Sequence, residues 1–125
     1  MTLPSVLVIG PELAGAPVAR ALVRRGWEVV LADPAGTPAD VELATRMRED
    51  GVELRLGTTL LGWLDLDTHV EAELSDGRVE NFDLIVDADP ASTMPAGARI
   101  VALPADTADP VGWADVLPVP GSPGR

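Results

Sequence analysis

The chain of 125 residues contains no cysteine, no lysine and a single histidine, His69. Without cysteine, the protein can have no disulfide, no thiol chemistry and no thiolate metal site. One histidine rules out a multi-histidine metal site and makes a Ser-His-Asp triad improbable. Basic residues are also scarce, since nine arginines stand against twenty acidic residues and leave a net charge of −11. This balance disfavours nucleic acids and anionic membranes as partners.

Long apolar runs are missing too, since none approaches the ~20 residues needed to span a bilayer. The sequence begins almost directly with a strand-like apolar run, so we expect no signal peptide and a cytoplasmic location. A hydrophobic content of 46% is ordinary for a globular protein. We expect one domain over residues 1–104 and a proline-rich tail over residues 105–125, with Trp113 as an anchor on a partner or on the domain itself.

The most informative segment runs from Ser5 to Asp33. An apolar run over residues 6–9 ends in Gly10, a helical pattern covers about residues 14–25, and a second apolar run over residues 29–32 ends in Asp33. Dinucleotide-binding turns carry glycines at their first, third and sixth positions and an acid roughly 20 residues further on. Gly10 and Gly15 fill the first and sixth positions, but the third is Glu12.

The substitution at the third position matters because backbone N–H groups of such a turn bind pyrophosphate at a helix N-terminus. Glu12 adds bulk and negative charge there, and Pro11 lacks an N–H. The alternative is a tight strand-to-helix turn that binds no ligand. Asp33 is expected to hydrogen-bond ribose hydroxyls and to favour NAD or ADP over NADP, or else to be an ordinary loop acid.

The rest of the pattern predicts the fold. A second helix over residues 39–50 should bury Val41, Leu43, Ala44 and Met47, and a third strand follows at residues 52–56. Strand-like segments at 59–66, 69–74 and 79–82, of which the second alternates cleanly, predict with the turn at 75–78 an antiparallel meander that has Trp63 in its core. Buried strands are expected at 84–86 and 99–103. We predict an α/β fold: a Rossmann-like three-layer domain in which strands 5–9, 28–32 and 52–56 are parallel neighbours.

Three stretches together carry a family resemblance: VLVIGPELAGAPVARALVRRGWEVVLAD, REDGVELRLGTTLLGW and VEAELSDGRVENFDLIVDAD. They resemble the NAD(P)-binding domain of FAD-dependent oxidoreductases of the pyridine nucleotide-disulfide type, over about residues 5–89. The resemblance implies that NAD, ADP or FAD is the candidate cofactor and that a larger flavoprotein is the expected partner. Glu12 and the turn Asp87-Ala88-Asp89-Pro90 depart from the family pattern, so the chain resembles a degenerate, stand-alone form. Its first 57 residues also resemble the N-terminal domain of Mur ligases. The hairpin at 75–78 argues against this second resemblance.

The candidate cofactor-binding residues are Gly10, Glu12, Gly15, Asp33 and Asp87. The acids among them, with Asp89, are alternatively a hard-cation site, a surface for a basic partner or a solvated rim. We expect no catalytic residue and no metal. Two functions stay open: an accessory nucleotide-binding domain or subunit of a flavin-dependent oxidoreductase, or a non-catalytic interaction module that kept the fold and lost the ligand. A cluster of arginines on the first helix is either a solvated face or a contact for an acidic partner: Arg20, Arg24 and Arg25.

Overall fold

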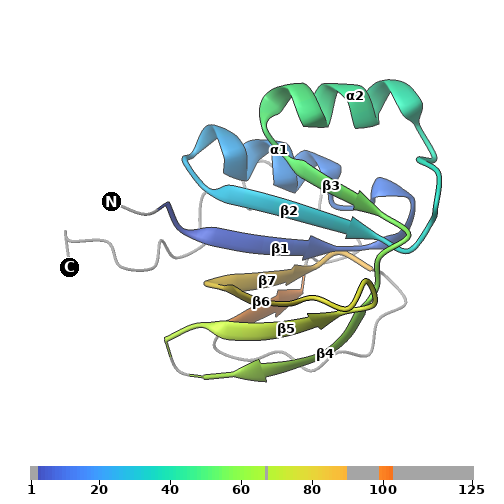
Figure 1. The fold of residues 1–125 in the computed structure, drawn as a ribbon. Coiled ribbons are helices and arrows are strands. Elements are labelled where there is room, and N and C mark those ends of the chain that lie inside the picture. The colour runs from blue at the N-terminus through green and yellow to red at the C-terminus, as the bar shows by residue number, and fades with distance from the viewer. Residues whose placement is uncertain (1–2, 67, 90–98, 103–125) are drawn as a thin grey trace.

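The computed structural model describes residues 3–66, 68–89 and 99–102. The expected tail over residues 105–125, including Trp113, lies outside this part. The elements follow one another along the chain (Figure 1) as β1 (Ser5–Ile9), η1 (Pro11–Leu13), α1 (Ala16–Arg24), β2 (Glu28–Asp33), α2 (Val41–Asp50), β3 (Glu53–Leu56), β4 (Leu60–Asp65), β5 (Val70–Leu74), β6 (Val79–Phe82), β7 (Leu84–Asp87) and β8 (Ile100–Ala102).

The strands form two sheets. Five parallel strands lie in the order β3-β2-β1-β7-β8, and the antiparallel meander has the order β4-β5-β6. The central strand β1 pairs with both neighbours, so Val8 lies opposite Leu31 of β2 and Val86 of β7. In Figure 1 the helices cover one face of the parallel sheet and the meander covers the other. The predicted three-layer architecture and the parallel neighbours β1, β2 and β3 are therefore confirmed.

Two apolar cores hold the three layers together, because alternate residues of a strand point to opposite faces. In β1, Val6 and Val8 belong to the core beneath the helices, whereas Leu7 belongs to the core beneath the meander. The meander contributes a set of fully buried side chains from β5: Val70, Ala72 and Leu74. Trp63 is partly buried against this second core, in agreement with its predicted place.

The helices begin and end where the local sequence signals place them. Helix α1 begins at Ala16, so Pro17 lies in its first turn, where a missing N–H costs little. Helix α2 is capped by Asp40, whose carboxylate accepts the Leu43 N–H, and Gly51 follows its end with a φ of 105°. The prediction that Val41 is buried is wrong, since it is 69% exposed. It is the first residue of α2, whereas Ala44 and Met47, further along the helix, are buried.

The arginines of α1 make contacts within the chain. Nε of Arg20 lies 2.6 Å from Oδ2 of Asp50, at the end of α2, and Arg24 lies 3.8 Å from the same oxygen. The guanidinium of Arg25 donates to the Ala21 carbonyl. Part of this basic face therefore joins α1 to α2.

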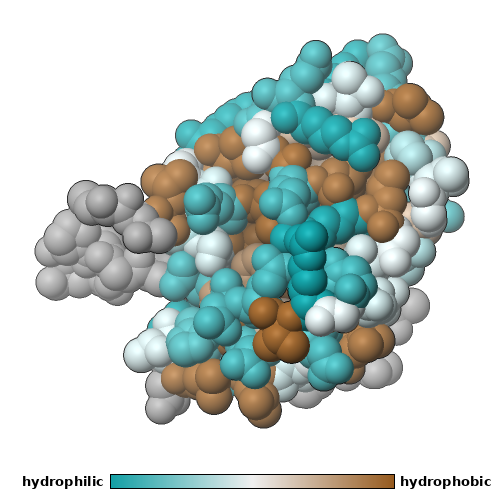
Figure 2. All heavy atoms as spheres, viewed as in Figure 1, coloured by the Kyte–Doolittle hydropathy of each residue, from teal (hydrophilic) through white to brown (hydrophobic). Residues whose placement is uncertain are grey.

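The solvent-facing side of the meander carries apolar side chains. Figure 2 shows brown apolar surface in several places on this face of the molecule, and part of it lies along the lower edge, where the meander is. The exposed large apolar residues of the meander and its turns are Leu61, Leu64, Leu66 and Val79. In the part of the chain that the structure describes, no helix has the length and apolar character needed to cross a membrane.

Candidate functional site

The turn from Gly10 to Gly15 joins β1 to α1 at the carboxyl end of the parallel sheet. Ile9, the last residue of β1, lies opposite Ala32 of β2 and Asp87 of β7. The strand ends at Asp33 and Asp87 consequently flank the turn on both sides. Open parallel sheets bind their ligands in this position, outside the carboxyl ends of the strands. The fold thus brings the predicted site residues together at the carboxyl end of the parallel sheet.

Both glycines of the turn allow a close approach of neighbouring atoms, which are side-chain atoms at Gly15 and a backbone atom at Gly10. A Cβ atom on Gly15 would lie 2.3 Å from Cγ1 of Val8, so α1 packs against β1 more closely than any side chain would allow. A Cβ atom on Gly10 would lie 3.2 Å from the carbonyl carbon of Ala88. These requirements come from packing and hold whether or not the turn binds a ligand.

The middle of the turn has an unusual backbone conformation. Glu12 has a φ of 55° and Leu13 a φ of 58°, so two successive non-glycine residues are left-handed. Each such residue costs about 1–2 kcal/mol relative to the right-handed conformation. Glu12 thus adopts a glycine-like conformation at the position where the dinucleotide fingerprint has a glycine, with its side chain exposed.

Several N–H groups of the turn are already bonded within the chain. The N–H of Gly10 donates to the Ala32 carbonyl at 3.4 Å, and that of Ala14 donates to the Pro11 carbonyl at 3.0 Å. The N–H of Leu13 donates to Oδ2 of Asp33 at 3.1 Å. Pro11 has no N–H at all. The turn therefore presents fewer free donors to an anion than an unsubstituted glycine-rich turn does.

The two strand-end carboxylates are also engaged. Asp33 is fully buried, and while Oδ2 accepts the Leu13 N–H, Oδ1 accepts the Ala35 N–H at 2.9 Å. Asp87 is nearly buried, and its Oδ1 accepts the Asp89 N–H at 3.1 Å. Buried carboxylates are tolerated when backbone donors satisfy them in this way. Among residues 3–66, 68–89 and 99–102, no group of three or more carboxylates and histidines is arranged to hold a metal ion.

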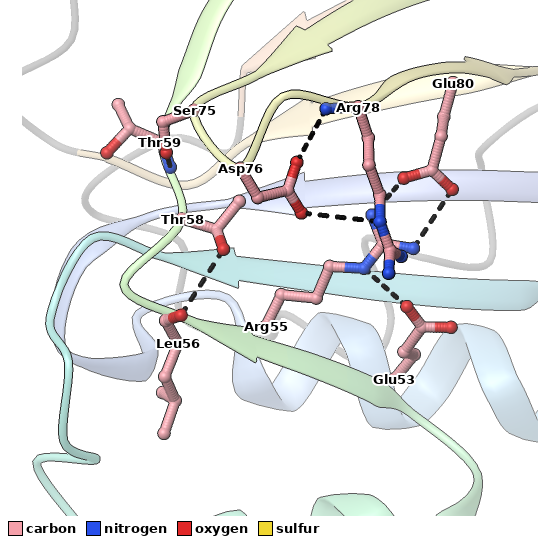
Figure 3. A network of polar contacts seen from close by, with 9 residues as sticks. All are labelled: Glu53, Arg55, Leu56, Thr58, Thr59, Ser75, Asp76, Arg78 and Glu80. Atoms are coloured by element: carbon pink, nitrogen blue, oxygen red, sulfur yellow. Dashed lines mark hydrogen bonds and ion pairs between the residues drawn. The ribbon is translucent and has the colours of Figure 1, made fainter.

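A network of charges lies away from the turn, between β3 and the meander, and the sequence pattern did not predict it (Figure 3). Arg55 of β3 donates to both carboxylate oxygens of Glu80 of β6, with Nη2–Oε1 at 3.0 Å. Its Nε also lies 2.5 Å from Glu53. The hydrogen bonds to Glu80 raise the pKa of Arg55, and the same contact lowers the pKa of Glu80. Both residues look like ordinary surface charges in the sequence, so only their pairing identifies them.

The network borders a cavity of about 730 Å³ at the opposite end of the sheet from the glycine turn. Ser5 and Glu28 contribute to its wall from the first residues of β1 and β2, and Arg55 and Glu80 contribute from the network. Most of its charged groups have partners within the chain. Arg55 binds Glu53 and Glu80, and the Asp83 carboxylate accepts the backbone N–H of Ser5. We assign no ligand to this cavity.

No protein-family model matches the chain. Several curated proteins share sequence with parts of it, and two of them represent the range. Over 91 residues, 66% of this chain and 24% of the relative, it is 36% identical to the nitric oxide reductase FlRd-NAD(+) reductase of Pectobacterium atrosepticum. Over 39 residues, 31% of this chain and 6% of the relative, it is 56% identical to the tRNA 5-methylaminomethyl-2-thiouridine biosynthesis bifunctional protein MnmC of Albidiferax ferrireducens. The chain therefore spans at most about a quarter of the length of these two relatives.

Solved structures share the fold at lower identity. An engineered water-forming NADPH oxidase bound to NADPH matches with a TM-score of 0.59 and 22% identity over 68% of this chain and 20% of that one. A pyridine nucleotide-disulfide family oxidoreductase from Enterococcus faecalis matches with a TM-score of 0.59 and 19% identity over 70% of this chain and 22% of that one. The chain thus has the three-layer fold found in parts of these larger oxidoreductases.

Proposed function

We propose that this chain is an accessory nucleotide-binding domain or subunit of a flavin-dependent oxidoreductase and is not catalytic alone. The observation that carries the proposal is the position of the Gly10–Gly15 turn. It lies outside the carboxyl ends of the parallel strands, where open α/β sheets bind ligands, and α1 packs closely on Val8. The ligand is the adenosine part of NAD, ADP or FAD. The similarity to part of a FlRd-NAD(+) reductase supports this choice.

The turn binds such a nucleotide weakly in this proposal. The N-terminus of α1 attracts phosphate through its dipole and its free N–H groups. The Glu12 carboxylate opposes this attraction, because one like-charge contact at ~4 Å costs about 1–4 kcal/mol, depending on the effective dielectric. That energy corresponds to roughly a tenfold to thousandfold loss of affinity.

The redox chemistry belongs to a partner in this proposal. The matched part of the chain spans 24% of the FlRd-NAD(+) reductase, so most of such an enzyme has no counterpart here. The histidine at position 69 lies in the meander, where its ring contacts the Thr68 hydroxyl, rather than at the glycine turn. We infer that a larger flavoprotein or another subunit supplies flavin, reductant and substrate site.

Two observations favour the second candidate, a non-catalytic interaction module. The N–H groups of Gly10, Leu13 and Ala14 are all bonded within the chain, which leaves the turn poorly suited to an anion. The outer side of the meander exposes Leu61 by 61% and Leu64 by 58%. Exposed apolar surface of this kind marks interaction sites when it forms a contiguous patch.

Calorimetric titration of ADP and NAD into the intact chain separates the candidates. Three forms are compared: the unmodified chain, Glu12→Gln, which removes only the charge, and Glu12→Gly, which also removes the side chain. We expect weak binding by the unmodified chain, about tenfold tighter binding by Glu12→Gln, and tighter binding still by Glu12→Gly. Glu42→Gln, an exposed acid on α2, is the matched control and should change nothing.

Each outcome decides between the two functions. Tight NAD binding by the unmodified chain without metal would contradict the electrostatic argument about Glu12. Failure of all forms to bind at millimolar nucleotide would contradict the nucleotide-binding proposal. The interaction module, with its closed turn, would then be the better description.

A further inference from the structure

The buried contact between Asp33 and the glycine turn bears on whether this chain hydrogen-bonds the ribose of a nucleotide. Asp33 ends β2 at the position from which a dinucleotide-binding domain reads ribose hydroxyls. Here its side chain has 0% exposure, and each carboxylate oxygen accepts a backbone N–H: Oδ2 from Leu13 and Oδ1 from Ala35. Leu13 is itself only 3% exposed, so the turn closes over the carboxylate.

The partners of Asp33 explain the left-handed turn. Leu13 has a φ of 58°, a conformation that a leucine rarely adopts without compensation. Its N–H reaches a buried carboxylate, and hydrogen bonds to charged acceptors are stronger than those to neutral ones. The Asp33 carboxylate therefore stabilises the backbone conformation that follows Glu12.

We propose that Asp33 is a positioning residue that locks the turn between β1 and α1, and that it does not read the ribose of a nucleotide. A ribose hydroxyl would reach this carboxylate only if the turn moved aside, because solvent does not reach it and each oxygen already accepts a backbone N–H. The statement about ribose rests on the proposed function, whereas the contact between Asp33 and the turn does not depend on any ligand. A nucleotide that binds here is consequently recognised through its phosphates and base, and Asp33 does not distinguish a 2′-hydroxyl from a 2′-phosphate.

The locking contact is tested by amide hydrogen exchange, followed by nuclear magnetic resonance, in the full chain. Asp33→Ala should make the Leu13 amide exchange at least about tenfold faster, because it loses its acceptor. Asp40→Ala is the matched control, since Asp40 accepts the Leu43 N–H at 3.0 Å in the same manner on an exposed helix end. It should accelerate Leu43 and leave Leu13 unchanged. The Leu7 amide in the central strand reports any general loss of stability.

An unchanged Leu13 exchange rate in Asp33→Ala would overturn the proposal. If that variant does not fold, Asp33→Asn serves instead, because its one remaining side-chain oxygen accepts only one of the two N–H groups. The proposal then expects faster exchange at Leu13 or Ala35 while Leu7 stays protected. Protection of both amides in Asp33→Asn would count against it.

The ligand consequence is tested with ADP and 2′,5′-ADP as probes, in Glu12→Gly and in Glu12→Gly combined with Asp33→Asn. The ratio of the two affinities should differ by less than about threefold between these forms. A shift of about tenfold or more towards 2′,5′-ADP in the double variant would show that Asp33 reads the ribose. Absence of all binding by Glu12→Gly would refute the proposed function, and the exchange rates alone would then decide the role of Asp33.

Discussion

Arg55 of β3 and Glu80 of β6 form a two-pronged ion pair that joins the edge of the parallel sheet to the meander (Figure 3). The arginine side chain is only 11% exposed, and the glutamate side chain is 32% exposed. A guanidinium in this setting relies on its carboxylate partner, because water replaces the lost hydrogen bonds poorly. The pair therefore stabilises the contact between two layers that are otherwise held by apolar packing.

Removal of either partner of this pair should destabilise the protein. Arg55→Met and Glu80→Gln should each lower the free energy of unfolding by about 1–3 kcal/mol, because the remaining, partly buried charge loses the hydrogen bonds of this pair. Urea denaturation of the two single variants and the double variant measures the coupling. Arg46→Met, from the exposed Arg46–Glu42 pair, is the control and should change stability by less than about 0.5 kcal/mol. A coupling energy between Arg55 and Glu80 no larger than that of the control pair would contradict this assignment.

Acid should weaken the same contact. The hydrogen bond from Arg55 holds the pKa of Glu80 below its ordinary value of about 4.5. A carboxyl whose pKa is lower in the folded state stabilises that state fully above its ordinary pKa, and this contribution disappears as the pH falls through the folded-state value. The difference in unfolding free energy between the unmodified chain and Glu80→Gln should be constant near neutral pH and shrink below about pH 4.5. A difference that grows on acidification would have the wrong sign.

A single methyl group at Gly15 should disturb the packing of α1 on β1. Its Cβ would lie 2.3 Å from Cγ1 of Val8, and that side chain is fully buried and stiff at χ1. We expect Gly15→Ala to cost about 1–3 kcal/mol of stability, measured by thermal or urea unfolding. Gly36→Ala is the matched control, because no atom lies within 4 Å of its added Cβ. Equal stability of the two variants would show that α1 moves freely away from β1.

Glycine at position 12 should stabilise the chain even without a ligand. Glu12 has a φ of 55°, which costs a residue with a Cβ atom about 1–2 kcal/mol but costs glycine nothing. Part of this gain is offset by the greater flexibility of glycine in the unfolded chain, so we expect a net gain of roughly 0.5–1 kcal/mol. Glu49→Gly, in the exposed part of α2, should instead destabilise by about 1 kcal/mol. A loss of stability in Glu12→Gly would refute the argument from backbone strain.

The sequence by itself was sufficient to predict the two α-helices and the strands. A strand period of two, a helix period near 3.6 and the turn at 75–78 depend only on residues that are close in the sequence. They can therefore be recognised before the fold is known. Helix α1 begins at Ala16, inside the helical pattern at about residues 14–25, and Pro17 then lies in its first turn. The exposed Val41 was predicted wrongly, because periodicity does not show where a neighbouring layer ends.

Only the tertiary structure decided what the charged residues contact. Asp33 stands 20 residues from Leu13, and Glu80 stands 25 residues from Arg55. In the sequence Asp33 fits either a ligand for ribose or an ordinary loop acid, and Glu80 looks like an ordinary surface carboxylate. Their roles depend on which backbone donors and guanidinium groups the folded chain brings within hydrogen-bonding distance. That depends on sheet order and on how the layers pack, and no local pattern of residues encodes either.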